Sequence, residues 1–157
     1  MSPPMTNESA GVIAPAPVFF VAAIALGFLL EYLVPTSLLS FEYSSLVAGS
    51  LIAVSVALVF SAVTQLTRAK TAFDARKPTT SIVTAGAFRI SRNPTYLSLA
   101  LLQVGLAFLF QSAWLLGTAV VAVAITHWGV ILREERYLEK KFSEEYLRYA
   151  ARVRRWL

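Results

Sequence analysis

Residues 93–132 read NPTYLSLALLQVGLAFLFQSAWLLGTAVVAVAITHWGVIL, and none of these 40 residues is Asp, Glu, Lys or Arg. A membrane-spanning helix needs about 20 apolar residues, because the hydrocarbon core is about 30 Å thick and each helical residue rises about 1.5 Å. The stretch is long enough for two such helices, and its polar pair Gln111–Ser112 lies where a turn between them would fall. It predicts an antiparallel hairpin of helices at 95–111 and 113–132.

Two further uncharged gaps, of 22 and 25 residues, precede the hairpin. Each fits one spanning helix, and we expect these at 17–34 and 44–66. A signal peptide is a poorer interpretation of the first gap, since no Lys or Arg precedes it and Pro15 and Pro17 lie in its N-terminal part.

The composition excludes several classes of protein. Hydrophobic residues make up 57% of the 157 residues and charged residues 15%, against roughly 25% charged in soluble domains. Neither a disordered chain nor a small soluble globule is expected. The chain has no cysteine and one histidine, His127, which excludes disulfides and multi-histidine metal clusters, so we expect no metal.

The basic residues indicate the orientation. All 14 Lys and Arg residues lie in 67–95 and 133–157, and the connections on the other side of four spans carry none. The positive-inside rule places both segments and both termini in the cytoplasm. We expect a bacterial inner membrane protein. Nucleic-acid binding is disfavoured, because both basic segments border spans, where Lys and Arg meet anionic lipid head groups.

These observations predict an all-α integral membrane protein of one domain, 1–157. Its four spans are joined by a cytoplasmic loop, 67–94, and followed by an amphipathic interfacial helix, 133–157. In that last segment apolar and aromatic residues recur every three or four positions, as on one face of a helix; they are Leu138, Phe142, Tyr146, Tyr149, Val153 and Trp156.

Polar residues of chemical interest lie at the cytoplasmic ends of the predicted spans. Glu134 and Glu135 stand where the fourth span ends, either as a ligand site or in local salt bridges with the flanking arginines. His127, inside the span, either faces a cavity or packs against a neighbouring helix. Arg92 and Asn93–Pro94 precede the third span, either as an anion-binding helix start or as simple helix punctuation.

The same residues carry a resemblance to a known family. Residues 84–96, TAGAFRISRNPTY, resemble the TxGxYxxxRHPxY segment of the isoprenylcysteine carboxyl methyltransferases. After the hairpin that family carries paired glutamates and a tail FGEEYxxYxxRVxR, and here Glu134–Glu135 is followed by FSEEYLRYAARVRRW, 142–156. The Asn-Pro-x-Tyr variant also resembles the phospholipid N-methyltransferases. The resemblance covers about 79–157.

The resemblance implies methyl transfer from S-adenosylmethionine, bound at the cytoplasmic membrane face without a Rossmann domain. Glu134 and Glu135 would hold the cofactor's ammonium group, and Arg92, His127 and Arg133 would act on the reactants. His127 is the neutral-pH candidate for accepting a proton if the acceptor is an amine. The remaining cofactor residues would be Thr80, Ser81, Ile82, Val83, Phe88, Asn93, Pro94, Thr95 and Tyr96.

The chain departs from the prenylcysteine enzymes at three positions. Asn93 replaces their His, Phe88 their usual Tyr, and Val130 an Arg that points toward their substrate. These departures disfavour a prenylcysteine carboxylate as the substrate. The resemblance still implies a methyltransferase for a hydrophobic or lipid-like acceptor from the bilayer, with O-methylation favoured. The alternatives are phospholipid N-methylation, a non-catalytic membrane scaffold and a nicotinamide-dependent membrane reductase. Binding of S-adenosylmethionine or of NADPH separates them.

Overall fold

The structure, a computed structural model, describes residues 14–37, 42–71 and 79–157. These residues form helices and connections without a strand, so the all-helical prediction is confirmed. The middle of the predicted loop, 72–78, lies outside the described residues. Along the chain the elements are α1 (Ala16–Leu33), α2 (Ser44–Arg68), the 3-10 helix η1 (Gly86–Arg89), α3 (Pro94–Leu109), α4 (Ala113–Thr126), the π-helical turn η2 (His127–Ile131), α5 (Leu132–Phe142) and α6 (Glu144–Ala150).

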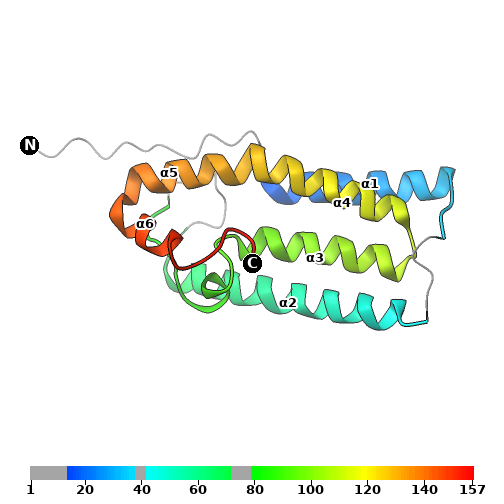
Figure 1. The fold of residues 1–157 in the computed structure, drawn as a ribbon, viewed down its shortest axis with the longest axis horizontal. Coiled ribbons are helices and arrows are strands. Elements are labelled where there is room, and N and C mark those ends of the chain that lie inside the picture. The colour runs from blue at the N-terminus through cyan, green and yellow to red at the C-terminus, as the bar shows by residue number, and fades with distance from the viewer. Residues whose placement is uncertain (1–13, 38–41, 72–78) are drawn as a thin grey trace, which may run out of the picture.

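The long helices form an elongated bundle in which α3 packs against α2 and the α3–α4 hairpin brings α4 against α1 (Figure 1). Small residues allow the close approaches, as is usual between membrane helices. A Cβ on Gly105 of α3 would lie 2.8 Å from Ile52 Cγ1 on α2. The hairpin turns where the sequence predicts, because α3 ends at Leu109 and α4 begins at Ala113.

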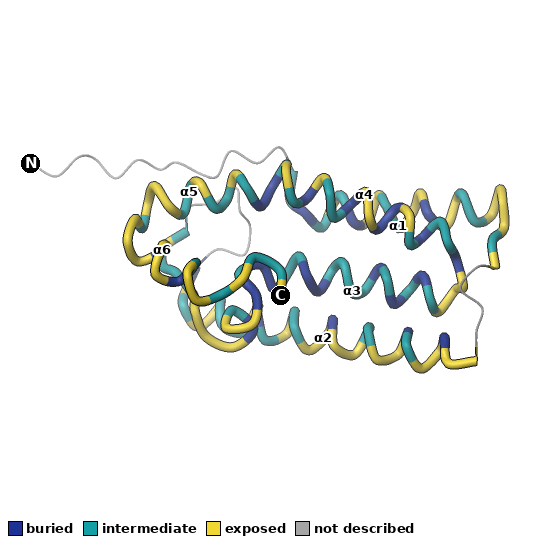
Figure 2. Tube along the Cα trace, viewed as in Figure 1, coloured by how far each residue is buried: buried dark blue, intermediate teal, exposed yellow. Residues whose placement is uncertain are grey.

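The outer surface of the bundle is apolar. Phe60, Val21 and Val120 are 74%, 66% and 65% exposed, and Figure 2 shows exposed residues along the outer side of α2. Apolar exposure on this scale indicates contact with lipid. Three helices are long and apolar enough to cross a membrane: α1, α2 and the continuous helix Ala113–Phe142. This confirms a membrane protein. α3 has 16 residues, about 24 Å at 1.5 Å per residue, so the count of four spans stays a prediction.

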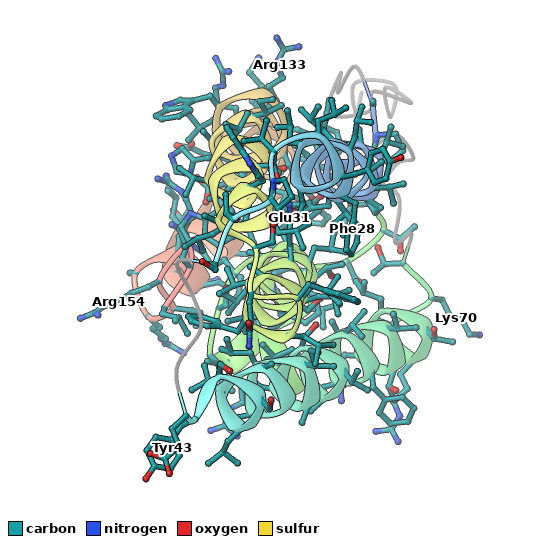
Figure 3. The ribbon with its side chains drawn as sticks, turned by 90° about the vertical axis from the view of Figure 1, so that its right-hand side faces the viewer. Phe28, Glu31, Tyr43, Lys70, Arg133 and Arg154 are labelled. Carbon is teal, nitrogen blue, oxygen red and sulfur yellow. The ribbon has the colours of Figure 1, made fainter. Side chains whose placement is uncertain are left out.

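A polar clamp joins α1 to the hairpin turn. The Glu31 carboxylate accepts hydrogen bonds from the hydroxyls of Thr36, at 2.7 Å, and Ser112, at 2.5 Å. The amide of Ala113 donates to the Thr36 hydroxyl at 2.9 Å. Figure 3, an end-on view, shows Glu31 among the helices while Arg133 and Arg154 lie at the periphery. Glu31 thus has a structural task at the end of the bundle opposite the cavities described below.

The C-terminal segment differs from the single amphipathic helix expected over 133–157. α5 continues α4 through the π turn and stops at Ser143, whose φ of 45° and ψ of −116° break the helix. α6 follows, and residues 151–157 return to the start of α3 (Figure 1). Two aromatic residues of the predicted apolar stripe, Tyr146 and Tyr149, lie beyond this break and are buried in the protein.

Candidate functional site

Two adjoining cavities lie at the end of the bundle that holds α6 and the segment before α3. They share Leu66, Phe88, Arg92, Asn93 and Glu134 as lining residues. The first is also lined by Thr71, Thr79, Ser81, Ile82, Val83, Glu135, Leu138, Tyr146 and Tyr149, and the second by Pro94, Thr95 and Tyr96. Ten of the eleven residues expected to contact a cofactor therefore lie around one connected region.

The exception is Thr80, which lines neither cavity. Its amide donates to the Thr71 hydroxyl at 3.1 Å and its hydroxyl to the carbonyl of Lys70 at 3.2 Å. It anchors the segment 81–83 to the end of α2.

Gly86 allows the loop to reach α2. Its φ is +59°, and a Cβ would lie 2.8 Å from the Ser61 hydroxyl oxygen. The next amide, of Ala87, donates to that oxygen at 3.0 Å. The Tyr149 hydroxyl then donates to the Phe88 carbonyl at 2.8 Å. The Gly of the TxGx motif is needed because only a residue without a side chain fits this contact, which places Phe88 at the cavities.

The start of α3 differs from the predicted cap. Pro94 occupies the first turn as expected, but Asn93 makes no side-chain capping bond. Its Nδ2 donates to the carbonyl of Arg155 at 3.0 Å, and the Ser91 hydroxyl donates to the same carbonyl at 3.1 Å. Asn93 is therefore used to hold the returning C-terminal segment.

The paired glutamates have different surroundings. Glu134 accepts a hydrogen bond from the Tyr96 hydroxyl at 2.9 Å and lines both cavities. The Glu135 carboxylate binds two guanidinium groups. Arg155 donates to its oxygens from Nε and Nη2 at 2.8 to 3.1 Å, and Arg92 Nη1 lies 3.3 Å from Oε1. A doubly paired carboxylate is a poor ligand for a further cation, so Glu134 is the available one of the pair.

Arg92 lies at the centre of the polar groups. Its Nη1 also donates to the Tyr146 hydroxyl at 3.3 Å, and its side chain is only 14% exposed. Its Nε is buried with no partner among the described residues. An orphaned guanidinium donor is costly unless a ligand completes it, so Arg92 is suited to an anionic or carbonyl group.

Two tyrosines line the first cavity beside Arg92: the Tyr146 hydroxyl accepts a hydrogen bond from Arg92 Nη1, and the Tyr149 hydroxyl donates one to the Phe88 carbonyl. Burial, together with the charge of Glu135, raises the pKa of Tyr146 to about 12. Burial likewise raises the pKa of Tyr149. Both phenols keep their protons at neutral pH, so neither supplies a base.

Of the three residues expected to act on the reactants, only Arg92 lines the cavities. His127 Nδ1 accepts a hydrogen bond from the Trp156 indole at 3.2 Å, and the two rings are stacked with centroids 6.3 Å apart. Arg133 is exposed at the periphery (Figure 3). A spacing of seven residues would place His127 and Glu134 on one face of a regular α-helix, but the π turn over 127–131 takes more residues per turn and changes that phase.

Sequence reasoning missed Tyr146, Tyr149 and Arg155. Their aromatic and basic pattern is that of an interfacial helix, and nothing local signals that the chain turns back. The tail motif was the available signal, because Tyr146 and Tyr149 are its two tyrosines and Arg155 is its last arginine.

The described residues thus form an apolar helical bundle with polar, carboxylate-containing cavities at one end, the arrangement of a membrane protein with a ligand site. Residues 43–145 match the phospholipid methyltransferase family. The chain belongs to this family, which is part of the isoprenylcysteine carboxyl methyltransferase-like superfamily. It is a membrane methyltransferase, and the resemblance seen in the sequence is confirmed.

The chain is also similar to an uncharacterized protein of Haemophilus influenzae. The two are 44% identical over 64 residues, which cover 40% of this chain and 98% of that protein. No solved structure matches the chain.

Proposed function

We propose that the protein transfers a methyl group from S-adenosylmethionine to a lipid-like acceptor in the membrane. One observation carries the proposal. Within the family-matched segment, the fold brings Glu134, Arg92 and Phe88 to one region, although Glu134 is more than 40 residues away in sequence. These three side chains complement an ammonium, a carboxylate and an aromatic or cationic group respectively.

The donor set suits S-adenosylmethionine. Glu134 would pair with the ammonium group, and the buried Nε of Arg92 would donate to the carboxylate in a charge-assisted hydrogen bond. The ring of Phe88 would lie against the adenine or the sulfonium. When bound, the cofactor supplies a methyl group activated by its attachment to a positively charged sulfur. The protein's contribution is to orient the two reactants and to exclude water.

The acceptor enters from the bilayer in this proposal. The cavities stand directly beyond the lipid-exposed bundle, and the apolar side chains of Leu66 and Leu138 form part of their lining. Burial of an acyl or prenyl chain stabilises the complex by about 0.8 kcal/mol per methylene. The amine of a phospholipid head group is the first acceptor to test, because of the family match, and a prenylcysteine carboxylate is the second.

Calorimetric titration of detergent-purified protein tests the cofactor. We expect saturable binding of S-adenosylmethionine and S-adenosylhomocysteine and none of NADPH. Ligand at 100 times its Kd stabilises the folded state by about 2.7 kcal/mol, which a thermal unfolding scan detects. Labelled S-adenosylmethionine in nanodiscs containing each acceptor then reports transfer. Binding of NADPH alone would support the reductase, and binding of neither ligand would support the scaffold.

A further inference from the structure

The last seven residues, 151–157, form a strap across the start of α3. The amide of Arg92 donates to the carbonyl of Arg154 at 2.9 Å. The carbonyl of Arg155 accepts from Ser91 and Asn93. These main-chain contacts hold the strap in place whatever side chains it carries at 154 and 155.

The strap delivers one guanidinium to the site. Arg155 binds both oxygens of Glu135, and Arg92 Nη1 lies 3.3 Å from Oε1 of the same carboxylate. The Arg155 side chain is 36% exposed, while the Glu135 and Arg92 side chains are 14% exposed. The more exposed Arg155 therefore lies outside the ion pair of Glu135 and Arg92, and that pair lines the cavity.

With both carboxyl groups ionised, the two negative charges of Glu134 and Glu135 equal the two positive charges of Arg92 and Arg155. Without Arg155, Arg92 would neutralise Glu135 alone, and the cavity wall would carry one net negative charge at Glu134.

Methyl transfer removes the positive charge from the sulfur of the cofactor. The bond between sulfur and the methyl carbon breaks with its electron pair remaining on sulfur, while a lone pair of the acceptor forms the new bond. The cationic sulfonium becomes a neutral thioether, and the charge passes to the nitrogen of an amine acceptor or cancels that of a carboxylate acceptor. In the transition state the positive charge on sulfur is already decreasing. A negatively charged cavity wall would therefore stabilise the bound sulfonium more than the transition state, and methyl transfer would be slower.

We propose that Arg155 is a positioning residue that neutralises Glu135 and thereby sets the preference of the cavity between the sulfonium cofactor and its thioether product. The inference rests on the proposed function. Glu134 remains the carboxylate for the ammonium group, which both ligands share. Arg155 acts through Glu135 and touches neither ligand.

The test measures Kd for S-adenosylmethionine and for S-adenosylhomocysteine by calorimetry, and uses the ratio of the two. The ligands differ by one methyl group and one positive charge. In Arg155→Gln the ratio shifts toward S-adenosylmethionine by about threefold to thirtyfold, as expected for one uncompensated charge at partly screened distance. The maximal rate falls in the same variant. A merely structural loss would weaken both ligands equally and leave the ratio unchanged.

Three further variants sharpen the result. Glu135→Gln, which removes a negative charge, shifts the ratio the other way. The double variant Glu135→Gln/Arg155→Gln restores neutrality, and its ratio returns to within about twofold of the wild type. Arg154→Gln is the matched control, because this neighbouring side chain is exposed and directed outward (Figure 3), and its ratio stays at the wild-type value.

An unchanged ratio in Arg155→Gln, or a double variant that keeps the shifted ratio, overturns the inference. If Arg155→Gln does not fold, Glu135→Gln decides alone by the direction of its shift. If neither ligand binds the wild-type protein, the proposed function itself is refuted. That result differs from an unchanged ratio, which overturns only the role of Arg155.

Discussion

Replacing Glu134 with Gln tests the central assignment of the site. Gln has nearly the same shape and keeps an oxygen that can accept the hydrogen bond from the Tyr96 hydroxyl, now 2.9 Å from Glu134. The substitution therefore removes a charge while leaving the local packing in place. Glu135 does not substitute for it, because Arg92 and Arg155 occupy its oxygens.

The expected loss follows from the one interaction removed. A hydrogen bond to a charged group contributes roughly 1.5–3 kcal/mol, and each 1.4 kcal/mol is a factor of about ten. Affinity for S-adenosylmethionine should fall by about tenfold to a hundredfold. Glu139→Gln, an exposed position on the same helix, should leave affinity unchanged.

Calorimetry with two ligands isolates the ammonium contact. 5′-Methylthioadenosine retains the adenosine and the sulfur but has neither ammonium nor carboxylate, so its Kd should change by less than about twofold in Glu134→Gln. Thermal unfolding scans confirm that the variant is folded. Unchanged binding of S-adenosylmethionine in a folded variant removes Glu134 from the site, and an equal loss for both ligands shows that the cavity itself has been disturbed.

Three other predictions concern the loop, the histidine and the topology. Gly86→Ala should destabilise the protein by about 1–3 kcal/mol, because an alanine at positive φ is strained and its Cβ would lie 2.8 Å from Ser61 Oγ; Gly49→Ala, where nothing lies within 4 Å of the added Cβ, is the control in the same unfolding assay. His127→Ala should leave cofactor affinity within about threefold, since His127 lines neither cavity, and a larger loss by calorimetry would place it in the cofactor site. A reporter fused after Leu157 should give a cytoplasmic signal, and a periplasmic signal would contradict the orientation inferred from the basic residues.

Much of the site was visible in the sequence because its motifs are local. The run 84–96 places Gly86, Arg92 and Pro94 at fixed short spacings, and the folded chain uses them at one loop and one helix start. The separate tasks of Glu134 and Glu135 were not visible, since they depend on Arg155, 20 residues further along the chain. Neighbouring identical residues carry no local signal of which one will be paired.

The surroundings of His127 also could not be predicted from the sequence. A spacing of seven residues predicts one helix face with Glu134, but the π turn over 127–131 changes the phase. Its ring then meets Trp156, 29 residues away. Backbone irregularities of this kind are selected by packing against distant residues, so periodicity alone does not detect them.

The sequence by itself determined that this is an apolar helical protein with a hairpin turning at Gln111–Ser112, because span length and charge are sums over neighbouring residues. Only the tertiary structure decided that the tail breaks at Ser143 and returns to the start of α3. The aromatic stripe of the tail fits a lipid interface and a protein interior equally well, since both bury apolar surface. The choice between them was made by long-range hydrogen bonds, from Asn93 and Ser91 to Arg155 and from Tyr149 to Phe88.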